Sequence, residues 1–181
     1  MQIETERLVL RQPEPGDAAA FFEIWNDDDT ARFVGGKKTR EQAEEMVDRM
    51  TRQWEVYGVG LFAVERKEDA RVIGRVGYLL WHSERWVPGL GEELGDEVET
   101  EVGWVVGREH WNRGYATEAA QACRDRALGE LGRARVISLI APGNAASIRV
   151  AEKIGERYEG DVQGEFFLEP VGLWAVGEAQ A

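Results

Sequence analysis

The stretch from Glu101 to Ala127, EVGWVVGREHWNRGYATEAAQACRDRA, restricts the fold of this chain more than any other. It opens with β-branched and aromatic residues interrupted by Gly103, which predicts a strand with a bulge or a close backbone approach. It ends with apolar residues at the spacing of one helical face, namely Ala116, Ala119, Ala120, Cys123, Ala127 and Leu128. Between the two lies a turn from Trp111 to Ala116, which contains Gly114 and no acidic side chain.

A strand that enters a helix through a glycine-containing turn has a chemical consequence. The first N–H groups of the helix have no partner inside it, and they lie at the positive end of the helix dipole. This arrangement binds phosphate groups. Several folds contain such a turn, so the turn alone does not identify the ligand.

Composition predicts a single domain over residues 1–181. The chain has 181 residues of which 43% are hydrophobic, enough for one buried core and short for two. Its 34 acidic and 22 basic residues give a net charge of −12. A protein with this negative charge repels nucleic acid and anionic membranes and attracts a cationic acceptor such as an amine. The alternative is that the charge serves only to keep the protein in solution.

Several other functions are disfavoured by single residues. One cysteine, Cys123, excludes an intramolecular disulfide, and its place on the apolar helix face indicates a core residue. His82 and His110 have no neighbours at metal-ligand spacing, so we expect no metal site. The polar, acidic start and the lack of ~20 consecutive apolar residues predict neither export nor a membrane span, and thus a cytoplasmic protein.

Residue patterns predict the elements of the first half. Asp17 is expected to cap a helix that buries Phe21, Phe22 and Trp25 and ends at the acidic run 27–29. Thr39 with Gln42 predicts a capping box for a second helix. Strands are expected at 7–12, 61–67 and 72–81. The polar insert 82–97 is longer than a hairpin needs; it is either a lid or acceptor-recognition element or a mobile extension, and Trp86 is its best anchor.

The second half continues the alternation of strands and helices. A strand is expected from Val98 into the stretch described above, and 136–140 is a short apolar strand typical of burial on both faces. Asn144 is a strong N-cap for a helix that ends at Gly155. The closing strands are expected at 157–162 and 171–176.

Two motifs in this order resemble a known family. The letters W-N-R-G-Y-A at 111–116 resemble the acetyl-CoA signature Q/R-x-x-G-x-G/A of the GCN5-related N-acetyltransferases (GNAT). The first letter is Trp in place of Gln or Arg, and together with E-V-G-W-V-V it resembles the RimJ/RimL-like branch that acetylates ribosomal-protein N-termini. About 30 residues after Gly114, Asn144 and Ser147 match the family's N-x-x-S pattern. Glu156 departs from it, because an aromatic residue is usual there; we interpret this change as one of packing at the helix end.

The resemblance implies a fold of the α/β (α+β) class. It implies a central, mixed and mostly antiparallel sheet flanked by about four helices, in which the strands at 102–106 and 136–140 are parallel and splay apart to hold the pantetheine arm of acetyl-CoA. The residues expected to bind this cosubstrate are Trp104, Val105, Val106, Trp111, Asn112, Arg113, Gly114, Tyr115, Ala116 and Asn144.

Acetyl transfer to an amine requires a base, because an ammonium cannot attack a thioester. The resemblance makes Glu101 the first candidate and Glu99 the second, the alternative being that both are solvated strand carboxylates. Backbone N–H groups at 104–106 would stabilise the oxyanion. Ser147 matches the serine to which proton donation to the thiolate is often assigned, and Tyr158 is the alternative.

The sequence therefore predicts an acetyl-CoA-dependent N-acetyltransferase that acts by direct attack in a ternary complex. The acceptor is either a peptide N-terminus or a small amine. The alternatives are a non-catalytic acyl-CoA-binding or regulatory module and, less favoured, a nucleotide-binding protein. Whether the protein is a monomer or a homodimer is left open.

Overall fold

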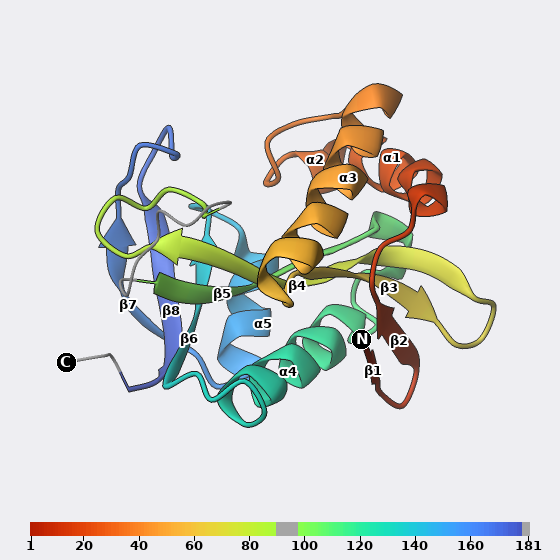
Figure 1. Ribbon diagram of the computed structural model, residues 1–181. Coiled ribbons are helices and arrows are strands. Elements are labelled where there is room, and N and C mark those ends of the chain that lie inside the picture. Colours follow the sequence, from red (N-terminus) through yellow and green to blue (C-terminus); the bar gives the residue numbers. More distant parts are fainter. Residues whose placement is uncertain (90–97, 179–181) are drawn as a thin grey trace. The chain divides into compact units, whose positions relative to one another are not determined.

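The computed structural model describes residues 1–89 and 98–178 (Figure 1). Its helices and short 3₁₀ turns are η1 (Pro15–Asp17), α1 (Ala18–Asn26), α2 (Asp28–Ala31), α3 (Arg40–Tyr57), η3 (Arg108–His110), α4 (Tyr115–Leu128) and α5 (Ala145–Lys153). Its strands are β1 (Gln2–Glu4), β2 (Leu8–Arg11), β3 (Leu61–Arg66), β4 (Arg71–His82), β5 (Val98–Val106), β6 (Arg135–Ile140), β7 (Arg157–Val162) and β8 (Val171–Gly177).

The strands form one mixed, mostly antiparallel sheet. Their order is β1-β2-β3-β4-β5-β6-β8-β7. The neighbours β5 and β6 are parallel, as the family resemblance implies, and Glu101 lies opposite Ile137. In the described parts of these two strands no further register pair follows, so regular pairing ends at this point. The fold class and the order of the main elements are therefore confirmed.

Three local expectations need correction. A short strand, β1, precedes the first expected strand and pairs with it. The acidic run ends α1, but Asp27 then caps α2 by accepting a hydrogen bond from the N–H of Thr30 at 2.9 Å. Asp17 occupies the N-cap position of α1 without capping it. Its two carboxylate oxygens instead bind the guanidinium of Arg11 at 2.8 and 2.7 Å, because a charge-assisted bidentate pair is stronger than a neutral N–H contact.

The backbone divides into two compact units, Met1–Gly77 with Trp104–Ala122 and Tyr78–Gly103 with Cys123–Ala181. The chain passes from one unit to the other within β4, β5 and α4. The single domain that composition predicts remains a prediction. These three elements, β4, β5 and α4, are shared by the two units.

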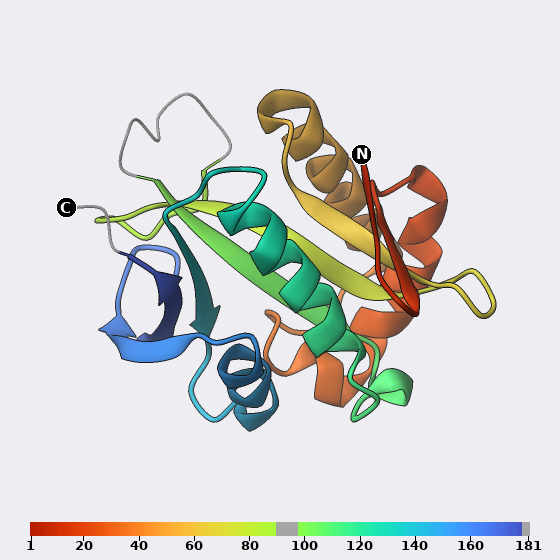
Figure 2. The same cartoon turned by 90° about the horizontal axis from the view of Figure 1, so that it is seen from below.

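In the first unit, two helices cover one face of the antiparallel strands β2 and β3. Helices α1 and α3 lie side by side there, and the first turns of α4 lie on the opposite face (Figures 1 and 2). Leu8 and Leu10 alternate with outward residues along β2 and are fully buried. The capping box expected at Thr39 is present, because Thr39 and Gln42 exchange hydrogen bonds between side chain and backbone.

The second unit is built on β6, β8 and β7, which pair antiparallel. Trp81, Trp86 and Ile137 form a core cluster with Leu173 and Ala175. Trp86 is thus the buried anchor expected in the polar insert. The lid or extension expected at 82–97 falls partly on residues 90–97, which lie outside the described residues.

Candidate active site

Glu101 lies in β5 within the second unit and is 7% exposed. Its Oε2 accepts a hydrogen bond from the indole N–H of Trp81 at 2.6 Å. A Cβ at Gly103 would lie 3.3 Å from Oε1 of this carboxylate, so glycine keeps the space beside it open. A buried carboxylate that accepts a hydrogen bond from a neutral donor has acceptor capacity left for a proton.

Trp81 is a residue that the sequence did not single out. Its ring packs against Phe166 and Phe167 at centroid distances of 5.5 and 5.3 Å. These contacts orient the indole N–H that meets Glu101. The donor and the acceptor lie on β4 and β5, 20 residues apart, so no local pattern could have paired them.

The alternative acid and base of the sequence analysis have other partners. Glu99 is half-buried, with Oε1 at 3.5 Å from Nε of Arg135. Burial raises the pKa of Glu99, and Arg135 opposes this effect. Tyr158 is exposed and donates its hydroxyl proton to Asp161 at 2.8 Å, which raises the pKa of the phenol. Glu99 thus has a cationic partner, and Tyr158 has an anionic one.

Asn144 and Ser147 lie at the start of α5, also in the second unit. Asn144 accepts the N–H of Ser147 on its side-chain oxygen at 3.2 Å, which confirms the predicted N-cap. The cap therefore uses the backbone of Ser147 and leaves its hydroxyl free. Among the described residues, that hydroxyl has no hydrogen-bond partner.

Glu156 lies just after α5, at the position where the sequence departs from the family pattern, and the interpretation of this change as one of packing stays a prediction. The structure buries its side chain to 3% exposure, with Oε1 at 3.0 Å from the hydroxyl of Ser138. Burial raises the pKa of Glu156 to about 8, and the negative charge of Glu101 adds to the shift. A second buried carboxyl thus lies in the same unit as Glu101.

The turn between β5 and α4 lies in the first unit and has the geometry expected of an anion site. Asn112 and Gly114 adopt positive φ angles of 58° and 82°. The indole N–H of Trp111 donates to the carbonyl of Val106 at 2.6 Å and fixes the start of the turn. Within the described part of the chain, the N–H groups of Tyr115, Ala116 and Thr117 have no acceptor. They are free to bind an anion at the positive end of α4.

Arg7, the residue just before β2, supports this turn and was also missed. Its guanidinium donates to the carbonyl of Arg113 at 2.9 Å and to Glu118 at 2.7 Å, and it lies over the ring of Tyr115 at 4.5 Å. Glu118 in addition accepts the backbone N–H of Arg7 at 2.9 Å. Two oppositely charged residues 111 positions apart in the chain thereby hold the turn in place.

The three β5 residues expected near the cofactor lie just before this turn. Trp104 is half-buried, and Val105 and Val106 are buried. A Cβ on Gly74 of β4 would come within 2.2 Å of the carbonyl oxygen of Val105, so only glycine permits this approach. The role of the N–H groups at 104–106 as oxyanion donors stays a prediction.

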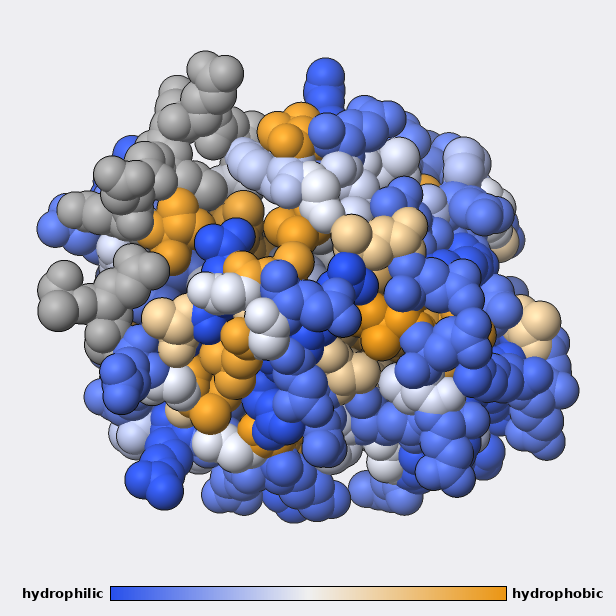
Figure 3. All heavy atoms as spheres, turned by 60° about the horizontal axis from the view of Figure 1, so that its bottom comes forward, coloured by the Kyte–Doolittle hydropathy of each residue, from blue (hydrophilic) through white to orange (hydrophobic). Residues whose placement is uncertain are grey.

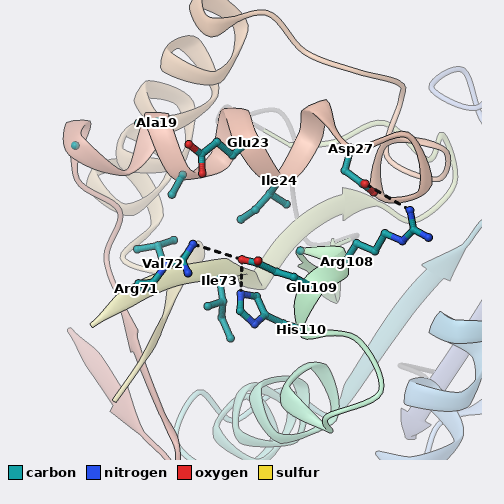
Figure 4. A pocket seen from close by; sticks show the side chains of 13 residues that line it. Ala19, Glu23, Ile24, Asp27, Arg71, Val72, Ile73, Arg108, Glu109 and His110 are labelled. Atoms are coloured by element: carbon teal, nitrogen blue, oxygen red, sulfur yellow. Dashed lines mark hydrogen bonds and ion pairs between the residues drawn. The ribbon is translucent and has the colours of Figure 1, made fainter. Parts of the chain in front are cut away.

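A cavity of about 570 Å³ in the first unit lies against α1, the start of β4 and η3 (Figure 4). Arg71 contacts Glu109 at 3.4 Å, and Arg108 lies 3.9 Å from Asp27. His110 is buried beside Glu109, and burial lowers the pKa of its imidazole. The residues that line this cavity include none of those expected to act in the site. Of the acidic groups in this cavity, Glu109 pairs with Arg71 and Asp27 with Arg108.

Two features of residues 1–89 and 98–178 bear on other functions. No group of three or more His, Cys, Asp or Glu side chains in this part of the chain is arranged to hold a metal ion. Of the helices in the same residues, none combines the length and the apolar character that crossing a membrane requires.

Comparison with known proteins identifies the family. Residues 7–157 match the Acetyltransferase (GNAT) domain family. The protein YkkB of Bacillus subtilis is 37% identical over 158 residues, which are 87% of this chain and 86% of that protein. An acetyltransferase structure from Agrobacterium tumefaciens superposes with a TM-score of 0.79 at 26% identity and covers 98% of this chain and 95% of its own.

The chain therefore belongs to the GNAT family and is an N-acetyltransferase. Its structural neighbours include ribosomal-protein acetyltransferases of the RimJ/RimL-like branch. One of them, the ribosomal-protein-S5-alanine acetyltransferase from Vibrio fischeri, has a TM-score of 0.75 at 17% identity and covers 98% of this chain and 96% of its own. At this identity the likeness demonstrates a shared fold.

Proposed function

We propose that this enzyme transfers an acetyl group from acetyl-CoA to a primary amine by direct attack in a ternary complex, with no covalent enzyme intermediate and no metal ion. The observation that carries the proposal is Glu101, a buried carboxylate fixed by Trp81 on the strand that pairs with β6. Acetyl-CoA supplies the activated acetyl group as a thioester.

Glu101 has the properties that a general base for this reaction needs. It is close to fully buried, so water competes weakly for it, and one oxygen is held by a neutral donor. Taking a proton from the incoming ammonium would turn the amine into a nucleophile. Glu99 is less suited, because Arg135 lies within ion-pair distance of its carboxylate.

The turn at 111–116 fits the phosphate groups of the cosubstrate. Its free N–H groups at the start of α4 can each donate to a phosphate oxygen, and a backbone cradle works whatever the side chains are. The exposed side chains of Asn112 and Arg113 are available for further phosphate contacts. Asn144 is half-buried and would bind a pantetheine amide.

Ser147 is the proposed proton donor to the departing thiolate. Its hydroxyl makes no hydrogen bond to the described residues, and it lies in the first turn of α5, where the helix dipole favours negative charge. Tyr158, the alternative, already donates to Asp161.

The acceptor is a cationic amine in either of two forms. The likeness to ribosomal-protein acetyltransferases favours a peptide N-terminus. The excess of 34 acidic over 22 basic residues would equally attract a small amine, and hydrophilic residues cover most of the surface seen in Figure 3.

Titration calorimetry with acetyl-CoA and with ATP, followed by thiol release over a panel of N-terminal peptides and small amines, tests the proposal. Gly114→Trp should abolish binding of acetyl-CoA, because its φ of 82° disfavours a side chain and Arg7 lies 3.3 Å from the added Cβ. Gly132→Trp is the matched control: it also has a positive φ, 61°, but has open space around it.

Each outcome of this experiment has a defined meaning. Binding of acetyl-CoA with thiol release for one class of acceptor supports the proposal and selects the substrate. Binding without release for any amine contradicts amine acetylation and favours a regulatory acyl-CoA-binding role. Equal loss of binding in both glycine variants contradicts the assignment of the phosphate site to the 111–116 turn.

A further inference from the structure

The loop that joins β7 to β8, residues 163–170 (the aromatic loop), exposes two large apolar side chains. Phe166 is 61% exposed, and Leu168 is fully exposed. Single apolar residues on a protein surface are ordinary, but two of them on one short loop beside other aromatic rings are typical of an interaction site. The proposed reaction has so far given this loop no role.

Contacts with residues 85–86 hold the aromatic loop in place. A Cβ on Gly164 would lie 2.3 Å from Cβ of Trp86, so only glycine allows the loop to approach this closely. The N–H of Glu165 donates to the carbonyl of Arg85 at 3.4 Å, and the N–H of Phe167 donates to the carbonyl of Gly164 at 3.2 Å. The loop is therefore preorganised, and a ligand that binds it loses little affinity to ordering.

The inner side of the aromatic loop contacts the residue that holds the candidate base. Phe167 packs against the core cluster that contains Trp81. The ring of Phe166 meets the Trp81 ring edge-on, with 5.5 Å between the centroids. The indole N–H of Trp81 in turn donates to Glu101 at 2.6 Å. A single indole thus separates the exposed ring of Phe166 from the carboxylate that is proposed to deprotonate the amine.

The charges on the aromatic loop favour a cationic ligand. Glu165 and Glu169 flank its apolar residues and are both exposed, and residues 163–170 include no lysine or arginine. Arg85 lies 3.6 Å from Glu165, whereas Glu169 has no ion-pair partner within residues 1–89 and 98–178. Apolar side chains between carboxylates suit a ligand that carries both an apolar group and a positive charge.

We infer that the aromatic loop binds an apolar side chain of the acceptor, and that the acceptor is a peptide N-terminus with a large apolar side chain at one of its first two residues. Two separate apolar groups, Phe166 and Leu168, suit a chain with successive side chains better than a compact amine. This inference rests on the proposed function and names the acceptor of that reaction. Phe166 and Leu168 are then specificity-determining residues, and Glu101 remains the proposed base.

Acetylation of matched peptides tests this assignment. Peptides with phenylalanine or leucine at the first or second position are compared with a peptide that has alanine at both, and with phenethylamine as a compact apolar amine. Burial of one such side chain predicts a kcat/KM at least about tenfold higher for the apolar peptides, through a lower KM at similar kcat. Phe166→Ser and Leu168→Ser should each lower this preference, and the two together should bring it below about twofold.

Val56→Ser is the matched control. Val56 is an apolar residue of α3 with nearly the exposure of Phe166, 59%, so its replacement removes a similar surface group elsewhere. This variant should keep the full preference. The ratio between two peptides on one variant cancels any loss of folded enzyme. Titration calorimetry of the same peptides measures the preference as a ratio of Kd values, without any need for turnover.

Three results would overturn the inference. They are equal kcat/KM and Kd for apolar and alanine peptides with the wild-type protein, a preference that the double variant keeps, and a higher kcat/KM for phenethylamine than for every peptide. Absence of thiol release with every acceptor contradicts the proposed function instead. The calorimetric preference and its loss in the double variant then still decide the inference, so the two failures are distinguishable.

Discussion

Glu156→Gln should stabilise the protein by an amount that grows with pH. The pKa of Glu156 is about 8 in the folded protein against an ordinary value of 4.5, so folding favours the protonated form. Below pH 4.5 the carboxyl is protonated in both the folded and unfolded states and costs nothing. Above that value the unfolded chain ionises freely while the folded chain does not, and the free energy of unfolding falls until the folded pKa is passed.

The magnitude follows from the two pKa values. Each pH unit between them removes about 1.4 kcal/mol from the free energy of unfolding. With a folded pKa of about 8, the cost is roughly 0.8 kcal/mol at pH 5 and roughly 3.3 kcal/mol at pH 7. Glutamine keeps the shape and can donate its amide N–H to Ser138, but it never ionises. Its advantage over glutamate should therefore increase by about 2.5 kcal/mol between pH 5 and pH 7.

Urea unfolding of both proteins at pH 5, 6, 7 and 8 measures this difference. Glu152→Gln on the surface of α5 is the control and should show an offset that does not depend on pH. Because Glu156 is 3% exposed, added salt should change the result little. A stability difference between Glu156→Gln and wild type that stays constant within about 0.5 kcal/mol from pH 5 to 7 would refute the reasoning.

Three further substitutions test other parts of the structure. Gly74→Ala places a Cβ 2.2 Å from the carbonyl of Val105 and should cost more than about 4 kcal/mol in thermal or urea unfolding; near-native stability would contradict the close approach of these strands. Arg7→Met removes the hydrogen bonds to Glu118 and the turn and should weaken acetyl-CoA binding about tenfold by calorimetry, whereas an unchanged Kd would deny Arg7 this supporting role. Ser147→Ala should lower the rate of thiol release about tenfold or more with little change in acetyl-CoA affinity; wild-type turnover would remove Ser147 from the reaction.

The features that the sequence predicted correctly depend on neighbours in the chain. The capping box at Thr39 and Gln42 and the N-cap at Asn144 are interactions over three residues. The order of strands and helices follows from hydrophobic periodicity, which is equally local. The turn before α4 belongs to the same class, since the free N–H groups are a property of any helix start and Gly114 allows the required φ; its binding of phosphate stays a prediction.

The features that the sequence missed join residues more than one helical turn apart, from six positions for Arg11 and Asp17 upward. Asp17 stands where a helix cap is expected. Its carboxylate does not cap α1, because it accepts two charge-assisted hydrogen bonds from the guanidinium of Arg11. Arg7 meets Glu118 across 111 positions, and Trp81 meets Glu101 across 20. No spacing rule connects such pairs, because register and packing of the strands decide them.

The sequence by itself determined the class of this protein, its family motifs and the side chains available for acetyl transfer. Only the tertiary structure decided their environments. In the folded protein Trp81 donates a hydrogen bond to Glu101, and Glu99 lies near Arg135. Glu156 is buried beside Ser138. The physical reason is that the pKa of a side chain depends on its burial and on the charges that folding brings near it. Neither can be read from the spacing of residues in the sequence.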